Sequence, residues 1–185
     1  MNLGKLNYDG SLIHDRFGYK YFKDQYVTTG CIVSFRGSMS VTTNLIDLED
    51  KLNNDFIFSD DALNFCWEIP NMCAIGGVAF QRLFCTYVAH ILSSVIKAEI
   101  TMKGDDIMVR VGEDQYKKAS VSISTTKNGC VLGHLGININ AGNKAPAFAY
   151  STNLSDEEVS SFIDEVEKVF YDTTRSIFVA TTKTI

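Results

Sequence analysis

The segment from Lys118 to Asn138 contains several chemically capable side chains, and its alternation of polar and apolar residues predicts two antiparallel strands. These side chains include a lysine, a histidine and an asparagine, separated by serines and glycines. A lysine can pair with a carboxylate, a phosphate or a developing oxyanion, and an asparagine can both donate and accept hydrogen bonds. The pattern suits the floor of a small-molecule pocket, or equally the solvated face that half-exposed antiparallel sheets commonly have.

The turn of this hairpin, Asn128-Gly129, is compatible with two registers. A two-residue type I′ turn would pair Lys127 with Cys130 and mix polar and apolar residues on each face. A three-residue loop would pair Thr126 with Cys130 and gather the apolar residues on one face. We predict the three-residue loop, because a one-residue slip exchanges whole faces and the apolar pattern should outweigh the turn signal. The other face would then hold Lys118 opposite Asn138, Ser120 opposite Gly136, and Ser122 opposite His134.

The elements that must position this hairpin follow from changes in hydrophobic periodicity. The predicted elements are strands at 27–35, 55–58, 63–69 and on both sides of Gly104, and helices from Phe80 to Val95 and from Ser155 onward. Ser155 and Glu158 have the spacing of a capping box. Helices separated by a run of strands indicate an α+β fold, in which a mainly antiparallel sheet is packed by two long helices. We expect one domain spanning residues 1–185.

The composition restricts the class of partner. The chain has 17 basic and 22 acidic residues, a net charge of −5, and no cluster of lysine and arginine. This excludes general affinity for nucleic acid or anionic membranes, which needs a dense basic surface. A small-molecule ligand is therefore the expected partner, and a homo-oligomer is compatible with the sequence. Five cysteines without metal-ligand spacing indicate reduced core thiols, and the absence of a signal-peptide pattern indicates a cytoplasmic protein.

Further candidates each have a functional and an ordinary interpretation. The acidic run from Ile46 to Asp61 could bind a divalent cation, but its spacing does not match a calcium loop and we favour a solvated loop, with no metal site. Arg36, beside Gly37 at the end of a predicted strand, could bind an anion or form an ion pair. The Gly76-Gly77 pair could offer backbone N–H groups to a phosphate, although a simple loop is the commoner case.

The segments "SDDALNFCWEIP", "GDDIMVRVGEDQYKKASVSIS" and "HLGININ" follow one another over residues 59–140. In this order they resemble the catalytic domain of biotin and lipoate protein ligases and octanoyltransferases. That domain has an Asn-Asp-Ile-like strand, a lysine heading an apolar strand, and a Gly-Ile-Asn-like strand about twenty residues later. Here Asp105-Asp106-Ile107, Lys118 and Gly136-Ile137-Asn138 stand at these positions.

A second set of five segments is distributed over the whole chain, and two of them overlap those above: "YDGS" at 8–11, "FRG" at 35–37, "IDLED" at 46–50, "SDDAL" at 59–63 and "KASVSI" at 118–123. Through them the whole chain resembles a largely archaeal family described as domain of unknown function 366. This resemblance implies a fold like the ligase catalytic domain, which is of the class II aminoacyl-tRNA synthetase type. It implies no particular activity.

The ligase resemblance implies roles for individual residues. Lys118 matches the lysine that contacts the acyl carbonyl and phosphate of an acyl-adenylate, Asp106 matches an acid near the nucleotide, and ATP would be the cofactor. The glycine- and arginine-rich loop that covers the adenylate is reduced here to Arg36-Gly37, which argues against ATP. Octanoyltransferases carry a nucleophilic cysteine downstream of the asparagine strand, whereas Cys130 lies upstream of it.

The sequence therefore predicts an acyl- or adenylate-handling protein. The alternatives are a non-catalytic protein that binds a small carboxylate or nucleotide, and a structural or protein-interaction module. The expected catalytic residue is Lys118. The expected binding residues are Arg36, Gly37, Asp106, Ser120, His134, Gly136 and Asn138.

Overall fold

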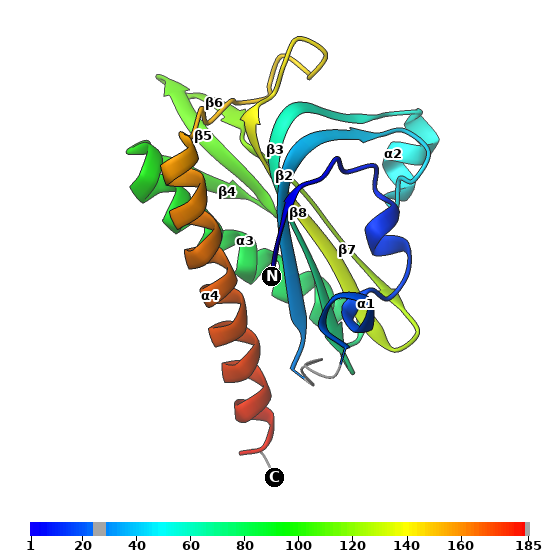
Figure 1. The fold of residues 1–185 in the computed structure, drawn as a ribbon. Coiled ribbons are helices and arrows are strands. Elements are labelled where there is room, and N and C mark those ends of the chain that lie inside the picture. Colours follow the sequence, from blue (N-terminus) through cyan, green and yellow to red (C-terminus); the bar gives the residue numbers. More distant parts are fainter. Residues whose placement is uncertain (24–28, 184–185) are drawn as a thin grey trace.

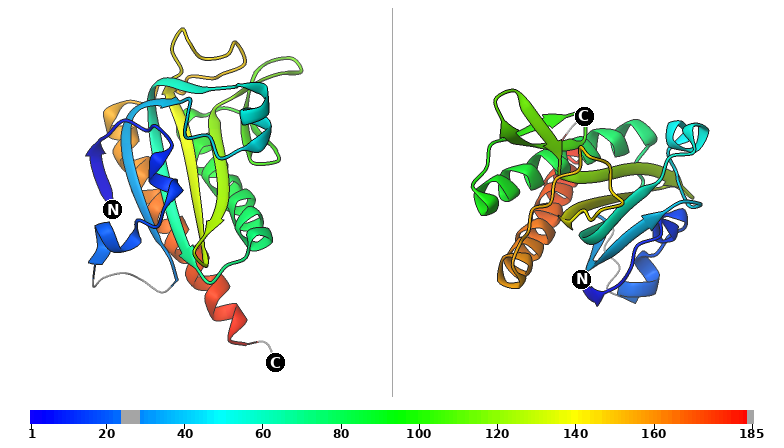
Figure 2. Two further views of the ribbon diagram at one scale, coloured as in Figure 1. Left: turned by 90° about the vertical axis from the view of Figure 1, so that its right-hand side faces the viewer. Right: turned by 90° about the horizontal axis from the view of Figure 1, so that it is seen from above.

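A computed structural model describes residues 1–23 and 29–183 and contains two sheets (Figures 1 and 2). The larger sheet has five strands in the order β1-β2-β3-β8-β7, and the smaller has three in the order β4-β5-β6. Only β1 runs parallel to its neighbour among the described strands, so the α+β, mainly antiparallel architecture is confirmed. The strands are β1 (Asn2–Lys5), β2 (Cys31–Val41), β3 (Ile57–Pro70), β4 (Ile100–Lys103), β5 (Asp106–Gly112), β6 (Gln115–Lys118), β7 (Ser120–Lys127) and β8 (Cys130–Asn140).

Helices cover both faces of the larger sheet (Figure 2). Two long helices, α3 (Ala74–Ile96) and α4 (Asp156–Thr181), lie on one face, as the apolar periodicity predicts. The short elements lie on the other: the 3-10 helix η1 (Ser11–His14), α1 (Gly18–Phe22) and α2 (Leu48–Asn53). The capping box is confirmed, because the backbone N–H of Ser155 donates to Glu158 Oε2 at 2.8 Å and that of Glu158 donates to Ser155 Oγ at 3.3 Å.

Each face of the sheet has its own apolar core. Between the sheet and the long helices, Trp67 packs edge-on against Phe84 with ring centroids 5.4 Å apart, and Phe80 packs likewise against Phe170 at 5.7 Å. On the opposite face, residues of the N-terminal segment such as Tyr8, Ile13 and Phe17 pack against β2 and β3. By length and composition α3 could also span a membrane, but its inward side is buried in the first of these cores.

The N-terminal segment is tied to the sheet by a buried carboxylate. Glu68 on β3 is fully buried and pairs with Arg16 Nε at 2.8 Å. The same carboxylate accepts the backbone N–H groups of Phe17 and Gly18 at 2.8 and 2.9 Å. Three such bonds offset the cost of burying the charge, so Glu68 positions the cover over the second face.

The predicted register of the β7–β8 hairpin is wrong. Lys127 pairs with Cys130, and both Asn128 and Gly129 have positive φ, at 51° and 74°, as a two-residue type I′ turn requires. Our argument assumed one solvated face, whereas both faces are covered. Ser122 therefore points toward α3, where its hydroxyl accepts a hydrogen bond from Gln81 Nε2 at 2.9 Å.

Lys118 is not part of this hairpin, so its predicted cross-strand pairing with Asn138 is also wrong. It ends β6 and pairs with Met108 in the smaller sheet. Its backbone N–H donates to the Phe148 carbonyl at 2.8 Å. Asn138 is nevertheless a neighbour, because its backbone N–H donates to the carbonyl of Ala119 at 2.9 Å.

Four smaller predictions also need correction. The strand predicted at 27–35 is β2, which continues through Arg36 and Gly37 to Val41; Val27 and Thr28 lie outside the described residues. The two strands predicted at 55–58 and 63–69 form a single strand, β3. None of the five cysteines, all of which lie among the described residues, forms a disulfide, but Cys73 is exposed, where it caps α3. The Gly76-Gly77 pair lies inside the first turn of α3 rather than in a loop.

The packing of β8 against the indole of Trp67 generates a stability prediction. A methyl group added at Gly133 would overlap the ring, so Gly133→Ala should lower the free energy of unfolding by about 1–3 kcal/mol. The matched control is Gly112→Ala, whose added methyl group would lie 3.5 Å from Gln115 and should change stability by less than about 0.5 kcal/mol. Denaturant unfolding followed by the fluorescence of Trp67, the single tryptophan, measures both. Equal stability of the two variants would contradict the close packing.

Candidate functional site

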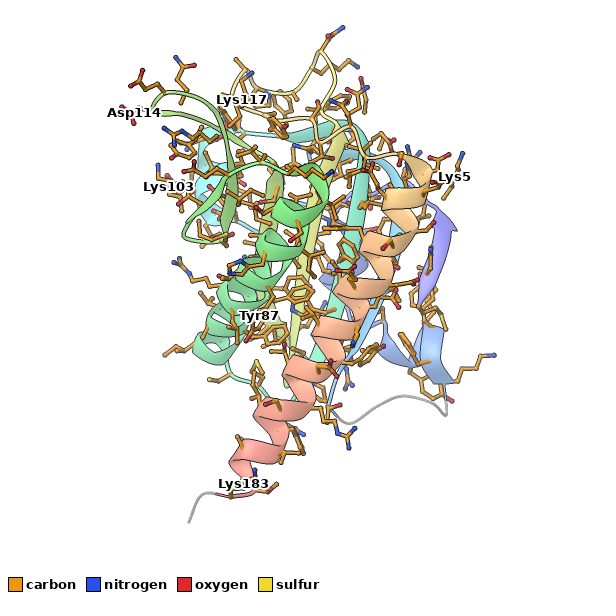
Figure 3. The ribbon with its side chains drawn as sticks, turned by 90° about the vertical axis from the view of Figure 1, so that its left-hand side faces the viewer. Lys5, Tyr87, Lys103, Asp114, Lys117 and Lys183 are labelled. Carbon is orange, nitrogen blue, oxygen red and sulfur yellow. The ribbon has the colours of Figure 1, made fainter. Side chains whose placement is uncertain are left out.

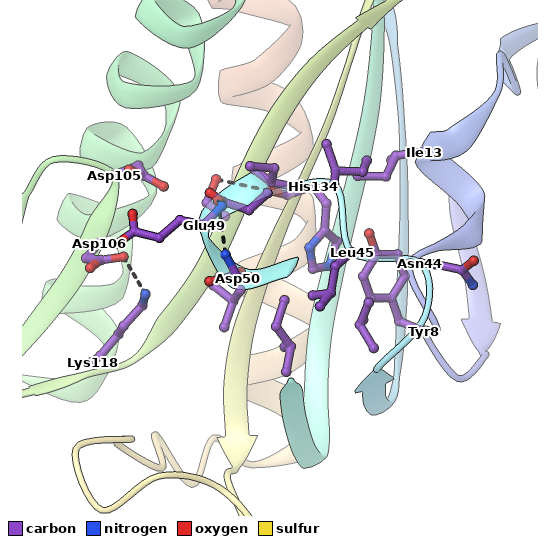
Figure 4. Close-up of a pocket in the computed structure, with 18 residues that line it drawn as sticks. Tyr8, Ile13, Asn44, Leu45, Glu49, Asp50, Asp105, Asp106, Lys118 and His134 are labelled. Carbon is purple, nitrogen blue, oxygen red and sulfur yellow. Dashed lines mark hydrogen bonds and ion pairs between the residues drawn. The ribbon is translucent and has the colours of Figure 1, made fainter. Parts of the chain in front are cut away.

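Two neighbouring cavities lie beside β7, on the face of the sheet away from the long helices. The first has a volume of about 330 Å³ and extends from the N-terminal segment and α2 to the start of β5 (Figure 4). The second has a volume of about 300 Å³ and is bounded by β3, β8 and the loop after β8. Asp50, Ile57, Lys118 and Val121 line both. Volumes of this size are at the lower end of the range for small-molecule sites.

Lys118 is at the junction of the cavities, in an ion pair with Asp106 (Figure 4). Lys118 Nζ lies 2.7 Å from Asp106 Oδ1, and the two side chains are 28% and 29% exposed. Within the described part of the chain, Lys118 is the one lysine or arginine that lines either cavity. Its neighbour Lys117 is exposed and lines neither cavity (Figure 3).

Asn138 lines the second cavity and is 4% exposed. Its backbone is fully bonded, since its carbonyl accepts from Thr152 N and Thr152 Oγ1. Its side-chain Oδ1 has no hydrogen-bond partner among the described residues. A buried acceptor without a donor costs about 1–3 kcal/mol, so a ligand that donates to Oδ1 would recover this energy.

The rest of the second cavity is largely apolar. Its apolar lining residues are Phe56, Ile57, Phe58, Val121, Pro146, Phe148 and Ala149. Phe56 and Phe148 are 53% and 58% exposed, so they form the open rim. This cavity can accept a short hydrocarbon group with its polar end at Lys118.

His134 lines the first cavity but is 2% exposed. Its ring stacks on Tyr8 with centroids 3.8 Å apart, and its Nε2 lies 3.0 Å from Asn64 Oδ1. Asn64 Nδ2 donates to the Ala62 carbonyl, so Asn64 Oδ1 acts as the acceptor and His134 carries its proton on Nε2. Burial lowers the pKa of His134 to about 3, so the imidazole is neutral and holds Tyr8 in place.

Carboxylates dominate the polar lining of the first cavity. They belong to Asp47, Glu49, Asp50, Asp105 and Asp106. Burial raises the pKa of Asp50, and Asp47 and Asp55 raise it further. Burial also raises the pKa of Asp105, whose Oδ2 accepts from Gln81 Nε2 at 3.0 Å. No group of three or more metal-ligating side chains occurs among residues 1–23 and 29–183.

The acidic run at 46–61 is not wholly a solvated loop, because Asp47, Glu49 and Asp50 line the first cavity. Asp47 caps α2 through the backbone N–H of Glu49 at 2.7 Å, and this short helix turns Asp50 toward Lys118. An aspartate before Leu48 is a recognisable capping signal. This signal could have predicted the helix, but it does not indicate which strand the helix covers.

The structure separates Arg36 and Gly37 from the other predicted site residues. Arg36 stands opposite Leu63, whose side chain belongs to the core under the long helices, so strand alternation places it on that face. There its Nη2 pairs with Asp61 at 2.7 Å and its Nη1 with Asp156 at 2.6 Å, beside a separate cavity of about 880 Å³. Our placement of Arg36 at the rim of the Lys118 pocket is wrong.

The remaining predicted residues divide into two groups. Ser120 lines the second cavity, and its hydroxyl accepts the backbone N–H of Ile107 at 3.0 Å. Gly136 lines neither cavity; an added methyl group there would press on Met39 Sδ, so packing explains the glycine. The structure thus brings Lys118, Asp106, Ser120, His134 and Asn138 to the cavities.

Comparison with known proteins identifies a family and a fold. A family model described as Domain of unknown function (DUF366) matches residues 2–185. The structure is similar to a "Protein of Unknown Function from Pyrococcus horikoshi", with a TM-score of 0.82 and 22% identity over 100% of this chain and 97% of that one. No curated protein matches the sequence.

Solved ligases share the fold at lower similarity. The bi-partite lipoate protein ligase of Thermoplasma acidophilum has a TM-score of 0.53 and 13% identity, over 88% of this chain and 80% of that one. Biotin protein ligase from Aquifex aeolicus, in complex with biotin and ATP, has a TM-score of 0.58 and 13% identity, over 94% and 70%. The predicted likeness to the biotin and lipoate ligase fold is confirmed.

The burial of His134 generates a prediction about pH. Its imidazole should not titrate in the folded protein as the pH falls from 8 to 4, because its pKa is lowered from 6.5 to about 3. Below about pH 6.5 the unfolded state binds a proton that the folded state does not. Each unit by which the pH falls there should therefore lower the free energy of unfolding by up to about 1.4 kcal/mol through His134. NMR of the imidazole nitrogens tests this, with the urea-unfolded chain as the control. A folded-state titration near pH 6 would contradict it.

Proposed function

The chain belongs to the family described as Domain of unknown function (DUF366), and we propose that it is an acyl-handling protein that binds a small carboxylic acid at Lys118. The acid's carboxylate pairs with the Lys118 ammonium, and its hydrocarbon part occupies the apolar second cavity. The observation that carries this proposal is the position of Lys118, which is the one cationic side chain lining either cavity among the described residues.

The ion pair of Lys118 with Asp106 is compatible with ligand binding. Both side chains are more than a quarter exposed, and ion pairs in such surroundings contribute about 0–1 kcal/mol. A ligand carboxylate can therefore share the Lys118 ammonium, which has three N–H donors, or displace Asp106 from it.

The fold supports handling of the acid at its carboxyl group. The structures of similar fold include a "putative lipoate protein ligase" with bound lipoic acid and a biotin protein ligase in complex with biotin and ATP, and both acids carry a carboxyl group on an apolar chain. In the sequence, Lys118 stands at the position of the ligase lysine that contacts the acyl carbonyl. In an activated acyl group, Lys118 would stabilise negative charge that develops on the carbonyl oxygen.

The carboxylates of the first cavity favour a second candidate, a protein that binds the acid without activating it. An acyl-adenylate would place a phosphate near Asp50, Asp105 and Asp106, and the neighbouring cation is already compensated by Asp106. Arg36, which could have supported a phosphate, lies on the other face of the sheet. Exchange of labelled pyrophosphate into ATP in the presence of a bound acid would identify activation.

Replacing the lysine tests the proposed binding site. Lys118→Ala should weaken the binding of hexanoate, octanoate or lipoate at least tenfold, because it removes the cation that the carboxylate needs. Lys117→Ala is the matched control, since Lys117 is exposed and lines neither cavity. Titration calorimetry measures the affinities. Equal affinity of an acid for both variants, or no binding of any of the three acids to the unmodified chain, would contradict the proposal.

A further inference from the structure

The ion pair of Lys118 and Asp106 presents both a positive and a negative group to a ligand at the junction of the cavities. Lys118 Nζ and Asp106 Oδ1 are 2.7 Å apart, so a positive and a negative group stand side by side. A plain carboxylate that takes the lysine leaves the Asp106 carboxylate without its cation. A ligand with an ammonium group next to its carboxylate would satisfy both members of the pair, each with an oppositely charged hydrogen-bonding partner.

The surroundings of Asp106 also favour a cation. Asp105, Asp50 and Glu49 line the same cavity, and Lys118 is the single lysine or arginine that lines it within the described part of the chain. The raised pKa values of Asp105 and Asp50 follow first from burial and then from neighbouring carboxylates. A ligand ammonium would reduce the repulsion between these carboxylates.

Asn138 provides an independent observation. Its Oδ1 is buried in the wall of the second cavity and has no donor among the described residues. A simple fatty acid, ionised at neutral pH, brings no N–H or O–H group to this acceptor. The acidic wall and Asn138 therefore both present acceptors, and a ligand with N–H donors suits the site better than a simple fatty acid does.

The apolar second cavity also borders Lys118, and it can hold a hydrocarbon group of the same ligand. We propose that the ligand is an α-amino acid with an apolar side chain: its carboxylate faces Lys118, its ammonium faces Asp106, and its side chain lies between Phe58, Phe148 and Val121. This rests on the proposed function, because it assumes that a carboxylate binds at Lys118. In an α-amino acid the ammonium and carboxylate groups are attached to the same carbon atom. They therefore lie side by side, as the adjacent Lys118 and Asp106 require.

Three acids with the same six-carbon chain test the inference on the full-length, unmodified chain. They are hexanoate, 2-aminohexanoate and 6-aminohexanoate, titrated by calorimetry at pH 7. We expect 2-aminohexanoate to bind at least tenfold more tightly than hexanoate. We expect 6-aminohexanoate to bind more weakly than hexanoate, because its ammonium would enter the apolar cavity.

A variant identifies the partner of the ammonium. Asp106→Asn should reduce the preference for 2-aminohexanoate over hexanoate to less than twofold, and it should bind hexanoate more tightly because Lys118 is no longer occupied. Asp114→Asn is the matched control: Asp114 is exposed in the β5–β6 turn (Figure 3), and its φ of 55° suits asparagine. This variant should keep the tenfold preference.

The possible results separate the two proposals. If hexanoate binds through Lys118 as tightly as 2-aminohexanoate, the amino-acid inference is wrong and the proposed function stands. If Asp106→Asn keeps the tenfold preference, the ammonium is not recognised by Asp106 and the inference is likewise overturned. If none of the three acids binds the unmodified chain, the proposed function fails, and the inference fails with it.

Discussion

The architecture depends on a sheet that is buried on both faces. Strands β3 and β8 pack under α3 and α4 on one side and under the N-terminal segment on the other. The second cover is built of short elements, and the fully buried Glu68 anchors it to the sheet through Arg16 and two backbone N–H groups. Removing that carboxylate would leave buried N–H groups without acceptors, and such groups are costly in a packed interior.

The two cavities lie where the cover over the second face of the larger sheet ends. The N-terminal segment and α2 reach β7, but β7 is the last strand of its sheet, and the smaller sheet begins beside it with β5 and β6. The junction of the two sheets brings Asp106 from the start of β5 to Lys118 at the end of β6. The site is therefore built on strand ends that backbone hydrogen bonds hold from both sides, which is the rigid support that a binding site needs.

Fold and chemistry give separate kinds of information about this protein. The likeness to biotin and lipoate ligases describes the arrangement of strands and helices, and such arrangements serve many unrelated activities. The chemistry depends on the side chains at the cavities, where one lysine lies among several carboxylates and one carboxamide oxygen has no partner among the described residues. These groups favour a ligand that carries both charges, and they are unfavourable for the phosphate of an adenylate.

The sequence alone determined the elements with strong local signals. The part of α3 from Phe80 to Val95, the capping box at Ser155 and the strands on both sides of Gly104 were predictable, because periodicity and capping are local properties. The first turn of α3, from Ala74, was not predicted. The local Asn128-Gly129 turn signal indicated the observed hairpin register, but the apolar pattern that we preferred to it is misleading where both faces of the sheet are covered. The face of Arg36 was not predictable, because it depends on tertiary packing. The covering segment, residues 8–17, lies more than a hundred positions before β8, and no pattern within the hairpin records its presence. Only the tertiary structure could therefore show that Lys118, Asp106 and Asn138 meet where two sheets join, and that Arg36 does not.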